Sequence, residues 1–420
     1  MEFLRCQYVI VRKKRSCKML VKNGEKFCAE HIIYDQENQG GHSPSERRIP
    51  CPLDPKHTVA AGNLKKHLKA CNSRLRICDD NPWIVENFNV DDTKEFDYSN
   101  FFHNLQTIDM DNLLNLFGRI DRAWSTIFDS VSNTCLIRVC FPYAVLYSHV
   151  NELELATAGK VARKHLIQQY AIADLLKKFH FVWPNTCFVE YGAGKAKLSY
   201  ELGKLFNEKC RFLLIEKCGL RGKAENKIKI DNTDCSNCDF TRIRCAIEHL
   251  DLRKHPIFKS PDQPNFVPIC KHLCGSAFDF TINSIINCFR KPDDLHLLGA
   301  VLIPCCHHRC LYSQFRGRTI FEEFGFSPND FKVMAQMSSW AVCKFRNNVA
   351  TENCLPDDRL NAVDKEKIGE KCKFIFDFCR GRYLEEKLRF YDKSYNVAFK
   401  RFVDSNVTPE NLALIVEKNE

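Results

Sequence analysis

Eight cysteine and histidine residues near the start of the chain have the types and spacing of two metal sites. The first four are spaced C-x10-C-x10-C-x2-H, and the next four are spaced C-x5-H-x9-H-x3-C. Zinc prefers four thiolate or imidazole donors in a tetrahedron, and segments this short cannot bury enough apolar surface to fold without the metal. The sequence therefore predicts two structural zinc ions, held by Cys6, Cys17, Cys28 and His31 in the first module and by Cys51, His57, His67 and Cys71 in the second.

Disulfides are the main alternative for a chain with 24 cysteines. The first 20 residues carry charges throughout and lack the apolar core of a secretory signal. We therefore expect an intracellular protein, cytoplasmic or nuclear and not secreted, whose thiols stay reduced. His42 is a rival zinc ligand, but it lies in Gly40–Ser45, a stretch whose glycine, serine and proline residues are typical of a linker. No apolar run approaches the length of about 18 residues that a membrane span needs.

The positive charge of the chain is concentrated around these modules. Residues 1–80 hold 16 lysines and arginines against 9 acids, a net charge of +7 out of +10 for the whole chain. Basic clusters such as Arg12–Arg15 and Lys65–Lys66 lie between the metal ligands. A metal-stiffened basic surface suits contacts with nucleic-acid phosphates, which supply affinity but little sequence information.

The rest of the chain alternates between strand and helix patterns. Apolar residues recur at helical spacing in Met110–Asp129 and Lys160–Phe179. Five short apolar strands follow, with helical stretches near Ala196–Phe206 and Phe278–Phe289; the strands are Cys187–Tyr191, Arg211–Glu216, Ile243–Ile247, Phe266–Cys270 and Gly299–Cys305. This alternation predicts an α/β fold with a parallel, doubly wound, Rossmann-like sheet. Ligands of such sheets bind beyond the carboxyl ends of the strands.

A glycine loop follows the first of these strands. Glu190 lies near the strand end, and Gly192 and Gly194 come before the next helix, where backbone approaches a ligand closely and free N–H groups are available. Glu216 lies at the end of the second strand, where an acid binds ribose hydroxyls in dinucleotide folds. An acid directly before the loop suits an amine-bearing ligand better than a pyrophosphate. The pattern therefore favours S-adenosylmethionine over NAD.

Titratable residues also follow the fourth and fifth strands. Lys271, His272, His307 and His308 are candidates to orient or deprotonate a nucleophile, because polar groups packed at strand ends are costly unless they have a function. Cys305, Cys306 and Cys310 form a third metal site with His307 in one interpretation. We favour a structural role for these cysteines, since adjacent ligands rarely complete a tetrahedron and buried free cysteine is common.

Together these motifs resemble a known enzyme family. In order they are the Cys/Cys/Cys/His module, CPLDPKHTVAAGNLKKHLKAC, FVEYGAGKAKLS, KHLCG, CCHHRC and MSSW. The chain resembles the eukaryotic tRNA 2′-O-methyltransferases that modify the fourth nucleotide, in the acceptor stem. The resemblance runs from Cys6 to about Leu388, with an unmatched stretch near Asp79–Gly159. The resemblance implies a Rossmann-like methyltransferase that uses S-adenosylmethionine on tRNA. Methylation of a 2′-oxygen requires alignment and deprotonation, and the candidate catalytic residues are Lys271, then His272, then His307.

The sequence departs from the family pattern at three positions. Ala196 stands where the family has a third glycine, Ala246 where it has an aspartate, and Phe278 within a motif that usually reads A-T-D. Ala196 and Ala246 motivate an alternative function, an RNA-binding zinc-finger protein whose methyltransferase-like domain is inactive. The expected domains are a CCCH zinc finger over 1–34, a CHHC finger over 48–75, a helical or irregular connector over 76–158 and the methyltransferase domain over 159–420.

Overall fold

The structure of the chain is a computed structural model. It describes residues 5–10, 15–17, 19–21, 26–28, 30–34, 43–71, 74, 81–90, 105–133, 152–206, 208–220, 222–226, 237–260, 262–290, 295–345 and 364–419. The chain divides into two compact units, Met1–Arg76 and Ile77–Glu420. Among the helices of the described ranges, none combines the length and the apolarity that a membrane span needs.

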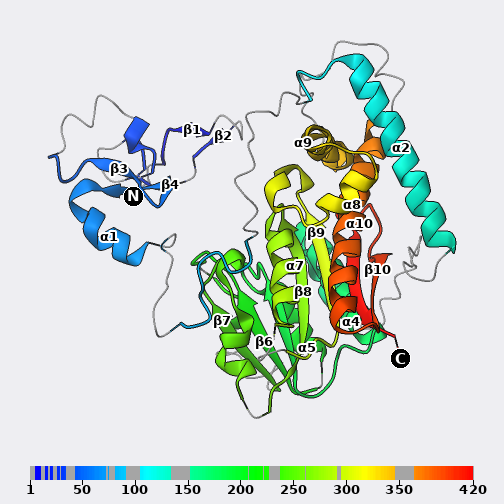
Figure 1. Cartoon of the computed structure of the whole chain (residues 1–420). Helices are drawn as coiled ribbons and strands as arrows, with labels where there is room; N and C mark the ends of the chain where they lie inside the picture. The colour runs from blue at the N-terminus through cyan, green and yellow to red at the C-terminus, as the bar shows by residue number, and fades with distance from the viewer. Residues whose placement is uncertain are drawn as a thin grey trace. The chain divides into compact units, whose positions relative to one another are not determined.

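The described residues of the first unit form two short hairpins and an α-helix (Figure 1). Strands β1 (Val9–Ile10) and β2 (Arg15–Ser16) pair antiparallel, as do β3 (Arg48–Cys51) and β4 (Asp54–Ala60), and helix α1 (Leu64–Ala70) follows β4. Cys6, Cys17 and Cys28, three of the predicted metal ligands, form a buried cluster against which Tyr8, Val21 and Phe27 pack. The rival ligand His42 and most of the first basic cluster lie outside the described residues.

A seven-stranded sheet forms the centre of the second unit, in the order β10-β11-β9-β8-β5-β6-β7. The pairs β5–β6, β6–β7, β5–β8 and β8–β9 are parallel, whereas β11 is antiparallel to both of its neighbours. The strands are β5 (Thr186–Tyr191), β6 (Cys210–Ile215), β7 (Cys238–Ile243), β8 (Asn265–Cys274), β9 (Ala300–Cys305), β10 (Tyr395–Arg401) and β11 (Leu412–Lys418).

Helices cover both faces of this sheet. The side chains of each strand alternate between the two faces, so both faces present apolar side chains that must be buried. Phe188 of β5 packs in the core cluster that also contains residues of α4 (Lys160–Lys178) and α5 (Lys197–Leu205). On the other face, the Tyr191 hydroxyl lies 2.9 Å from Ser284 Oγ of α7 (Ala277–Asn287). Helix α10 (Lys365–Tyr391) lies beside α7 in front of the sheet (Figure 1). The doubly wound fold is therefore confirmed.

Among the described residues, four further helices pack around α10 or precede the sheet. Helix α2 (Met110–Asn133) contacts α10, and its Arg119 forms a bidentate ion pair with Asp330 of α9 (Pro328–Met337) at 2.7 and 2.8 Å. Helix α8 (Arg318–Glu323) also contacts α10, and α3 (Glu152–Thr157) precedes α4. The helices predicted at Met110–Asp129 and Lys160–Phe179 are confirmed.

Two expectations for the sheet were wrong. The third strand is Cys238–Ile243, not Ile243–Ile247, because this edge strand is half-exposed and its polar residues resemble a loop pattern. The sheet is mixed, because β10 and β11 add two antiparallel strands that follow the long helix α10. Of the stretch expected to be a loop, Asp79–Phe102, the described residues 81–90 form turns that hydrogen-bond to residues 247–251.

Candidate active site and zinc centres

The first zinc module brings together all four predicted ligands. The ligand atoms of Cys6, Cys17, Cys28 and His31 lie within 4.8 Å of one another. The sulfurs of Cys6 and Cys28 lie 3.5 and 3.3 Å from His31 Nδ1. Zinc bonds of about 2.3 Å to sulfur and about 2.0 Å to nitrogen place tetrahedral ligand atoms about 3.3–3.8 Å apart, so this set fits zinc. Tyr8 stacks on the His31 ring at 4.1 Å and fixes its orientation.

The second module also brings together its four predicted ligands. Cys51 ends β3, His57 lies in β4, His67 in α1, and Cys71 directly follows α1. The Cys51 and Cys71 sulfurs are 3.7 Å apart, and the Nε2 atoms of His57 and His67 are 3.2 Å apart. The Asp54 carboxylate lies 3.6 Å from His57 Nδ1. A carboxylate near the outer nitrogen of a ligating histidine favours the tautomer that binds zinc through Nε2.

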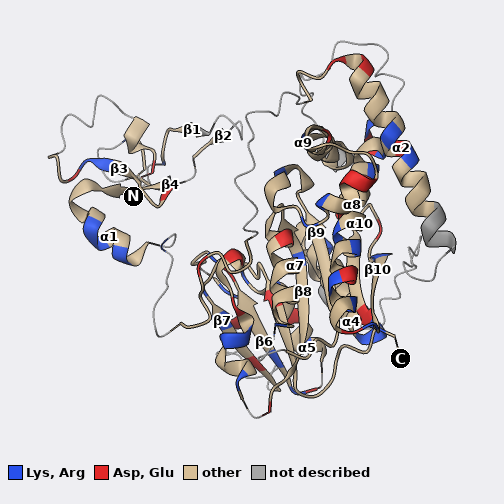
Figure 2. Ribbon diagram, in the orientation of Figure 1, with Lys and Arg blue, Asp and Glu red and all other residues tan. Residues whose placement is uncertain are grey.

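Helix α1 presents a basic face beside this second set of ligands. Lys65, Lys66 and Lys69 are exposed on the helix, which contains no acid (Figure 2). The zinc ligands His67 and Cys71 anchor the same helix, so metal binding and the position of these charges are linked. Such a surface suits the phosphates of an RNA backbone.

The glycine loop connects β5 to α5 at the carboxyl edge of the sheet. Gly192 and Gly194 have φ values of +67° and +53°, which favour glycine. A Cβ placed on Gly194 would meet no atom closer than 4.0 Å, so the loop is open on that side, whereas one on Gly192 would lie 2.9 Å from Leu273 Cδ1 of β8. Ala196 has φ +54°, so this alanine keeps the left-handed geometry that a third glycine would favour.

Glu190 lies beneath this loop and is buried. Its Oε2 accepts hydrogen bonds from the Ser199 hydroxyl at 2.5 Å and the Ser199 N–H at 3.3 Å, which joins β5 to the start of α5. Burial raises the pKa of Glu190 to about 7, although the Ser199 hydrogen bonds act in the opposite direction. One carboxylate oxygen is thus engaged by the protein, and the other is the predicted contact for a cofactor.

Glu216 directly follows β6 and is tied to the same loop. Its Oε2 accepts a hydrogen bond from Gly194 N–H at 2.9 Å, and its Oε1 accepts one from Cys218 N–H at 2.8 Å. The predicted cofactor residues Glu190, Gly192, Gly194 and Glu216 therefore form one group at the ends of β5 and β6. Ala246, which lies beyond the end of β7, offers no carboxylate to this group.

Lys271 and His272 lie near the end of β8, next to helix α4. The Lys271 ammonium nitrogen is 3.4 Å from His165 Nδ1, and His272 Nε2 is 3.0 Å from Gln168 Oε1. Burial lowers the pKa of Lys271 to about 8, and the neighbouring Glu190 carboxylate opposes this shift only in part. A lysine whose pKa is near the operating pH exchanges a proton readily, as a general base must.

His307 occupies a different environment from these two residues. It is buried, and its Nε2 lies 2.8 and 2.9 Å from the carboxylate oxygens of Asp377 in α10. Asp377 also pairs with the buried Arg380, whose guanidinium bonds both oxygens of Asp279 in α7. This network connects the loop after β9 to two helices. His308, by contrast, is exposed.

The interpretation of Cys305, Cys306, His307 and Cys310 as one metal site does not match this geometry. His307 pairs with Asp377, and the Cys310 sulfur accepts a hydrogen bond from Arg380 at 3.1 Å. Cys305 and Cys306 instead meet Cys274, from the end of β8, with the three sulfurs within 4.8 Å of one another. The sequence did not identify Cys274 as a member of this cluster, because it lies 31 residues before Cys305 in the chain. The signal that could have identified it is its position in the KHLCG motif, on the strand next to β9.

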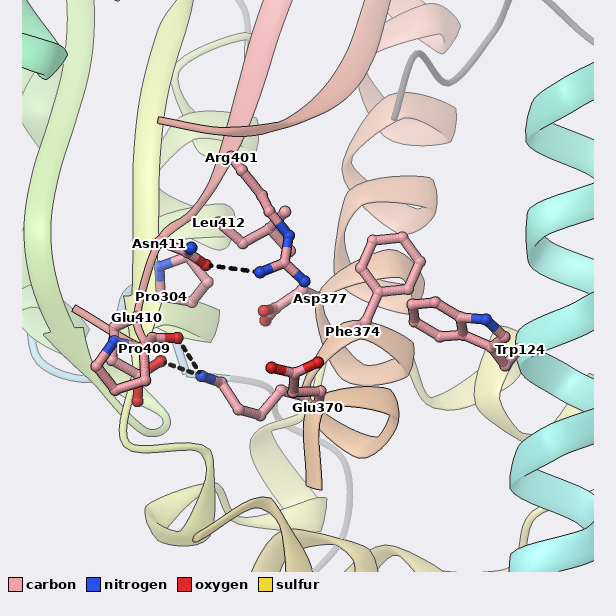
Figure 3. A pocket seen from close by; sticks show the side chains of 11 residues that line it. Trp124, Pro304, Glu370, Phe374, Asp377, Arg401, Pro409, Glu410, Asn411 and Leu412 are labelled. Atoms are coloured by element: carbon pink, nitrogen blue, oxygen red, sulfur yellow. Dashed lines mark hydrogen bonds and ion pairs between the residues drawn. The ribbon is translucent and has the colours of Figure 1, made fainter. Parts of the chain in front are cut away.

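A pocket lies at the same edge of the sheet, between β9, α10 and the segment that joins β10 to β11 (Figure 3). Trp124 and Phe374 form an aromatic wall, with ring centroids 5.1 Å apart. Glu370, Asp377 and Glu410 supply three carboxylates, and Lys373 bonds Glu410 at 2.6 Å. The pocket is not basic, so phosphate contacts are expected elsewhere. The sequence did not predict this pocket, because its lining comes from α2, β9, α10 and the segment from the end of β10 to the start of β11.

The sheet has an antiparallel strand inserted beside its parallel strands, and the glycine loop lies between two strand-end acids. These two features define a Rossmann-like methyltransferase. Two zinc modules precede it. The family described as "Methyltransferase TRM13" matches residues 167–417, and the chain belongs to this family. The "CCCH zinc finger in TRM13 protein" matches residues 4–32, and the "U11-48K-like CHHC zinc finger" matches residues 48–72.

Curated relatives align along almost the whole chain. The mouse "tRNA:m(4)X modification enzyme TRM13 homolog" is 28% identical over 98% of this chain and 93% of the mouse protein. The corresponding protein of Scheffersomyces stipitis is 29% identical over 97% of this chain and 99% of its own length. Among solved structures, a putative S-adenosyl-L-methionine-dependent methyltransferase from Methanococcus maripaludis aligns at 14% identity and a TM-score of 0.30, covering 64% of this chain and 92% of that one.

These matches confirm the predicted family, with its methyltransferase domain and its two zinc fingers. The predicted cofactors, S-adenosylmethionine and zinc, agree with a methyltransferase family of this fold and with the two ligand groups. The chain is therefore a methyltransferase of a tRNA-modification family.

Proposed function

We propose that the chain transfers a methyl group from S-adenosylmethionine to the ribose 2′-oxygen of the fourth nucleotide in the tRNA acceptor stem. The observation that carries this proposal is the meeting of the glycine loop, Glu216 and Lys271 at one edge of the sheet. The relatives are named tRNA:m(4)X modification enzymes, and these names support tRNA as the proposed substrate and the fourth nucleotide as the proposed position. Such a substrate implies a place in the cytoplasm or the nucleus.

The cofactor supplies a methyl group on a sulfonium, which is transferred in line to an oxygen nucleophile. In our proposal the loop at Gly192 and Gly194 holds the cofactor closely, Glu216 binds its ribose hydroxyls, and Glu190 binds its amine. Lys271 takes the proton from the 2′-hydroxyl as the oxygen attacks. His272 and His307 are the other candidates; we assign His307 a positioning role, because it is buried and paired with Asp377.

The division of work between the two units is also a proposal. The zinc fingers, assigned to 1–34 and 48–75, grip the acceptor stem through its shape and its phosphates, because A-form duplex is recognised in this way. The methyltransferase domain, assigned to 159–420, holds the cofactor and the reacting sugar, with 76–158 as connector. Affinity for tRNA should then fall steeply with added salt, since each phosphate contact releases counterions.

Replacement of Glu216 by alanine is expected to weaken S-adenosylmethionine binding by about 1–3 kcal/mol, the cost of losing a charged hydrogen-bond partner. Isothermal titration calorimetry of the full-length chain measures this directly. Glu216→Gln keeps an acceptor for Gly194 N–H and separates loop support from ribose binding. Glu323→Ala, at an exposed position in α8, is the matched control. Affinity equal to that of the parent in Glu216→Ala would show that the ribose site is elsewhere.

The complete activity is tested by single-turnover methylation of total tRNA, followed by mapping of the methylated sugar. Transfer to the 2′-oxygen of the fourth nucleotide supports the proposal, and transfer to another position contradicts it. A chain that binds tRNA but transfers no methyl group would favour the alternative function, an RNA-binding protein with an inactive domain. Ala246→Asp is informative in either case, because it adds the strand-end acid that this chain lacks and should tighten cofactor binding.

A further inference from the structure

Three cysteine sulfurs gather where β8 and β9 end. Cys274 Sγ lies 3.3 Å from Cys305 Sγ and 3.4 Å from Cys306 Sγ. Cys274 and Cys305 are direct partners in the parallel ladder between the two strands. Leu273, the residue before Cys274, packs against Gly192 of the glycine loop. The trio therefore lies at the reactive edge of the sheet, although none of the roles proposed above uses it.

The backbone arranges this trio at some cost. In an extended strand, consecutive side chains point to opposite faces, so Cys305 and Cys306 would normally diverge. Cys306 has φ +53° and ψ +47°, a left-handed conformation that is unfavourable for a residue other than glycine. This turn places the sulfurs of two consecutive residues beside the same third sulfur. Adjacent cysteines rarely bind one metal ion because their side chains diverge, and the left-handed conformation of Cys306 removes this divergence.

Contacts between the two loops hold this arrangement. Gly275 N–H donates to the Cys305 carbonyl at 3.1 Å, and Leu311 N–H donates to Ser276 Oγ at 3.0 Å. A Cβ on Gly275 would lie 2.7 Å from the Arg309 carbonyl oxygen, so only glycine allows the loops to pack this closely. The three thiols are thus brought together by the fold and do not depend on mobile side chains.

The distances between the sulfurs exclude a disulfide and lie close to those of thiolates that share a metal ion. A disulfide requires sulfurs about 2.0 Å apart and pairs only two of the three. Tetrahedral zinc places two thiolates about 3.8 Å apart. In the CHHC finger of this chain the Cys51 and Cys71 sulfurs are 3.7 Å apart, and Cys51 Sγ lies 3.1 Å from His67 Nε2. Cys274 and Cys306 are also partly exposed, unlike the fully buried Cys270 and Cys288.

We propose that Cys274, Cys305 and Cys306 bind one zinc ion through their three thiolates, in addition to the ions of the two fingers. Three protein ligands leave the fourth tetrahedral position to a water molecule or to a substrate atom, as in sites that exchange a ligand. Binding displaces the thiol protons, so the site takes up zinc more readily as pH rises. The ion would lie beside the loop that approaches the cofactor.

Elemental analysis of the full-length chain tests this site. The parent is expected to carry three zinc ions, and Cys274→Ala and Cys305→Ala are each expected to carry two. Cys288→Ala, which removes a buried thiol of the same unit, should retain three. Because the result is a difference between parent and variant, it does not depend on whether the fingers are fully loaded. Equal zinc content in the parent and in both trio variants would overturn the proposal.

Alkylation of the parent protein tests the site without any substitution, so misfolding of a variant cannot affect the result. With zinc present, Cys274 and Cys306 should resist iodoacetamide, and treatment with a chelator should make both reactive. The exposed Cys218 should react equally in the two states and serves as the internal control. Mass spectrometry of the digested chain reads each cysteine separately. Equal labelling of Cys274 and Cys306 before and after chelation would show that no metal is bound there.

Discussion

Methylation of tRNA is expected to fall by about two orders of magnitude or more when Cys51 and Cys71 are both replaced by alanine. Zinc supplies about 10–16 kcal/mol to the folding of such a finger, so the loss of two ligands removes the fold of the module. Helix α1 then no longer presents Lys65, Lys66 and Lys69 together, and several phosphate contacts are lost. S-adenosylmethionine affinity should not change, because the cofactor residues belong to the other compact unit.

The measurement is the single-turnover rate at tRNA concentrations below saturation, with calorimetry of cofactor binding in parallel. Cys218→Ala removes an exposed cysteine and should match the parent. The slope of log affinity against log salt should also become shallower in the finger variant, since fewer counterions are released. A finger variant that methylates tRNA at the parental rate would mean that the fingers are not the RNA-binding surface.

Replacement of Lys271 by methionine is expected to lower the rate of methyl transfer by about 10²–10⁴-fold, the usual contribution of a general base. The pKa of Lys271 is lowered to about 8 by burial, so the neutral amine that accepts a proton accumulates as pH rises through 8. The parental single-turnover rate should therefore rise with pH up to about 8 and then level off. The variant should lose this rise, and Lys271→Arg, whose side chain stays protonated, should behave like methionine.

Lys418→Met is the matched control for Lys271. Lys418 ends β11 at the opposite edge of the sheet and pairs with Asp392, so its loss should leave the rate and its pH dependence unchanged. Cofactor affinity should be close to parental in all these variants. If Lys271→Met retains the parental rise with pH, the proton acceptor is another residue. His272 would not produce that rise, because burial lowers its pKa to about 4.

Local patterns in the sequence were sufficient for features whose parts lie close together in the chain. The two zinc quartets fall within 26 and 21 residues, and the glycine loop lies between one strand and one helix. The central strands β5, β6, β8 and β9 are buried apolar runs, so their positions were predicted to within a few residues. Metal-ligand spacings, glycine loops and buried strands are each recognised from residues that lie close together along the chain.

Features that depend on contacts between distant segments were not predictable. Cys274 joins Cys305 only because β8 and β9 are neighbours in register. Asp377 and Arg380, which fix His307 and Asp279, lie within α10, and their partners come from segments 70 and 101 residues away. The edge strand β7 is half-exposed and lacks a continuous apolar run. Register, pairing and burial in the assembled core decide these features.

The insertion of β11 between β9 and β10 has a consequence for synthesis of the chain on the ribosome. β11 is translated after both of its neighbours, yet it supplies the ladder that connects them. Until residues 412–418 emerge, β9 has an open edge and β10 has no partner in the sheet. Open strand edges pair with other chains. A stop codon between β10 and β11 would therefore release an aggregation-prone nascent protein, even though every proposed cofactor and zinc residue has already been translated.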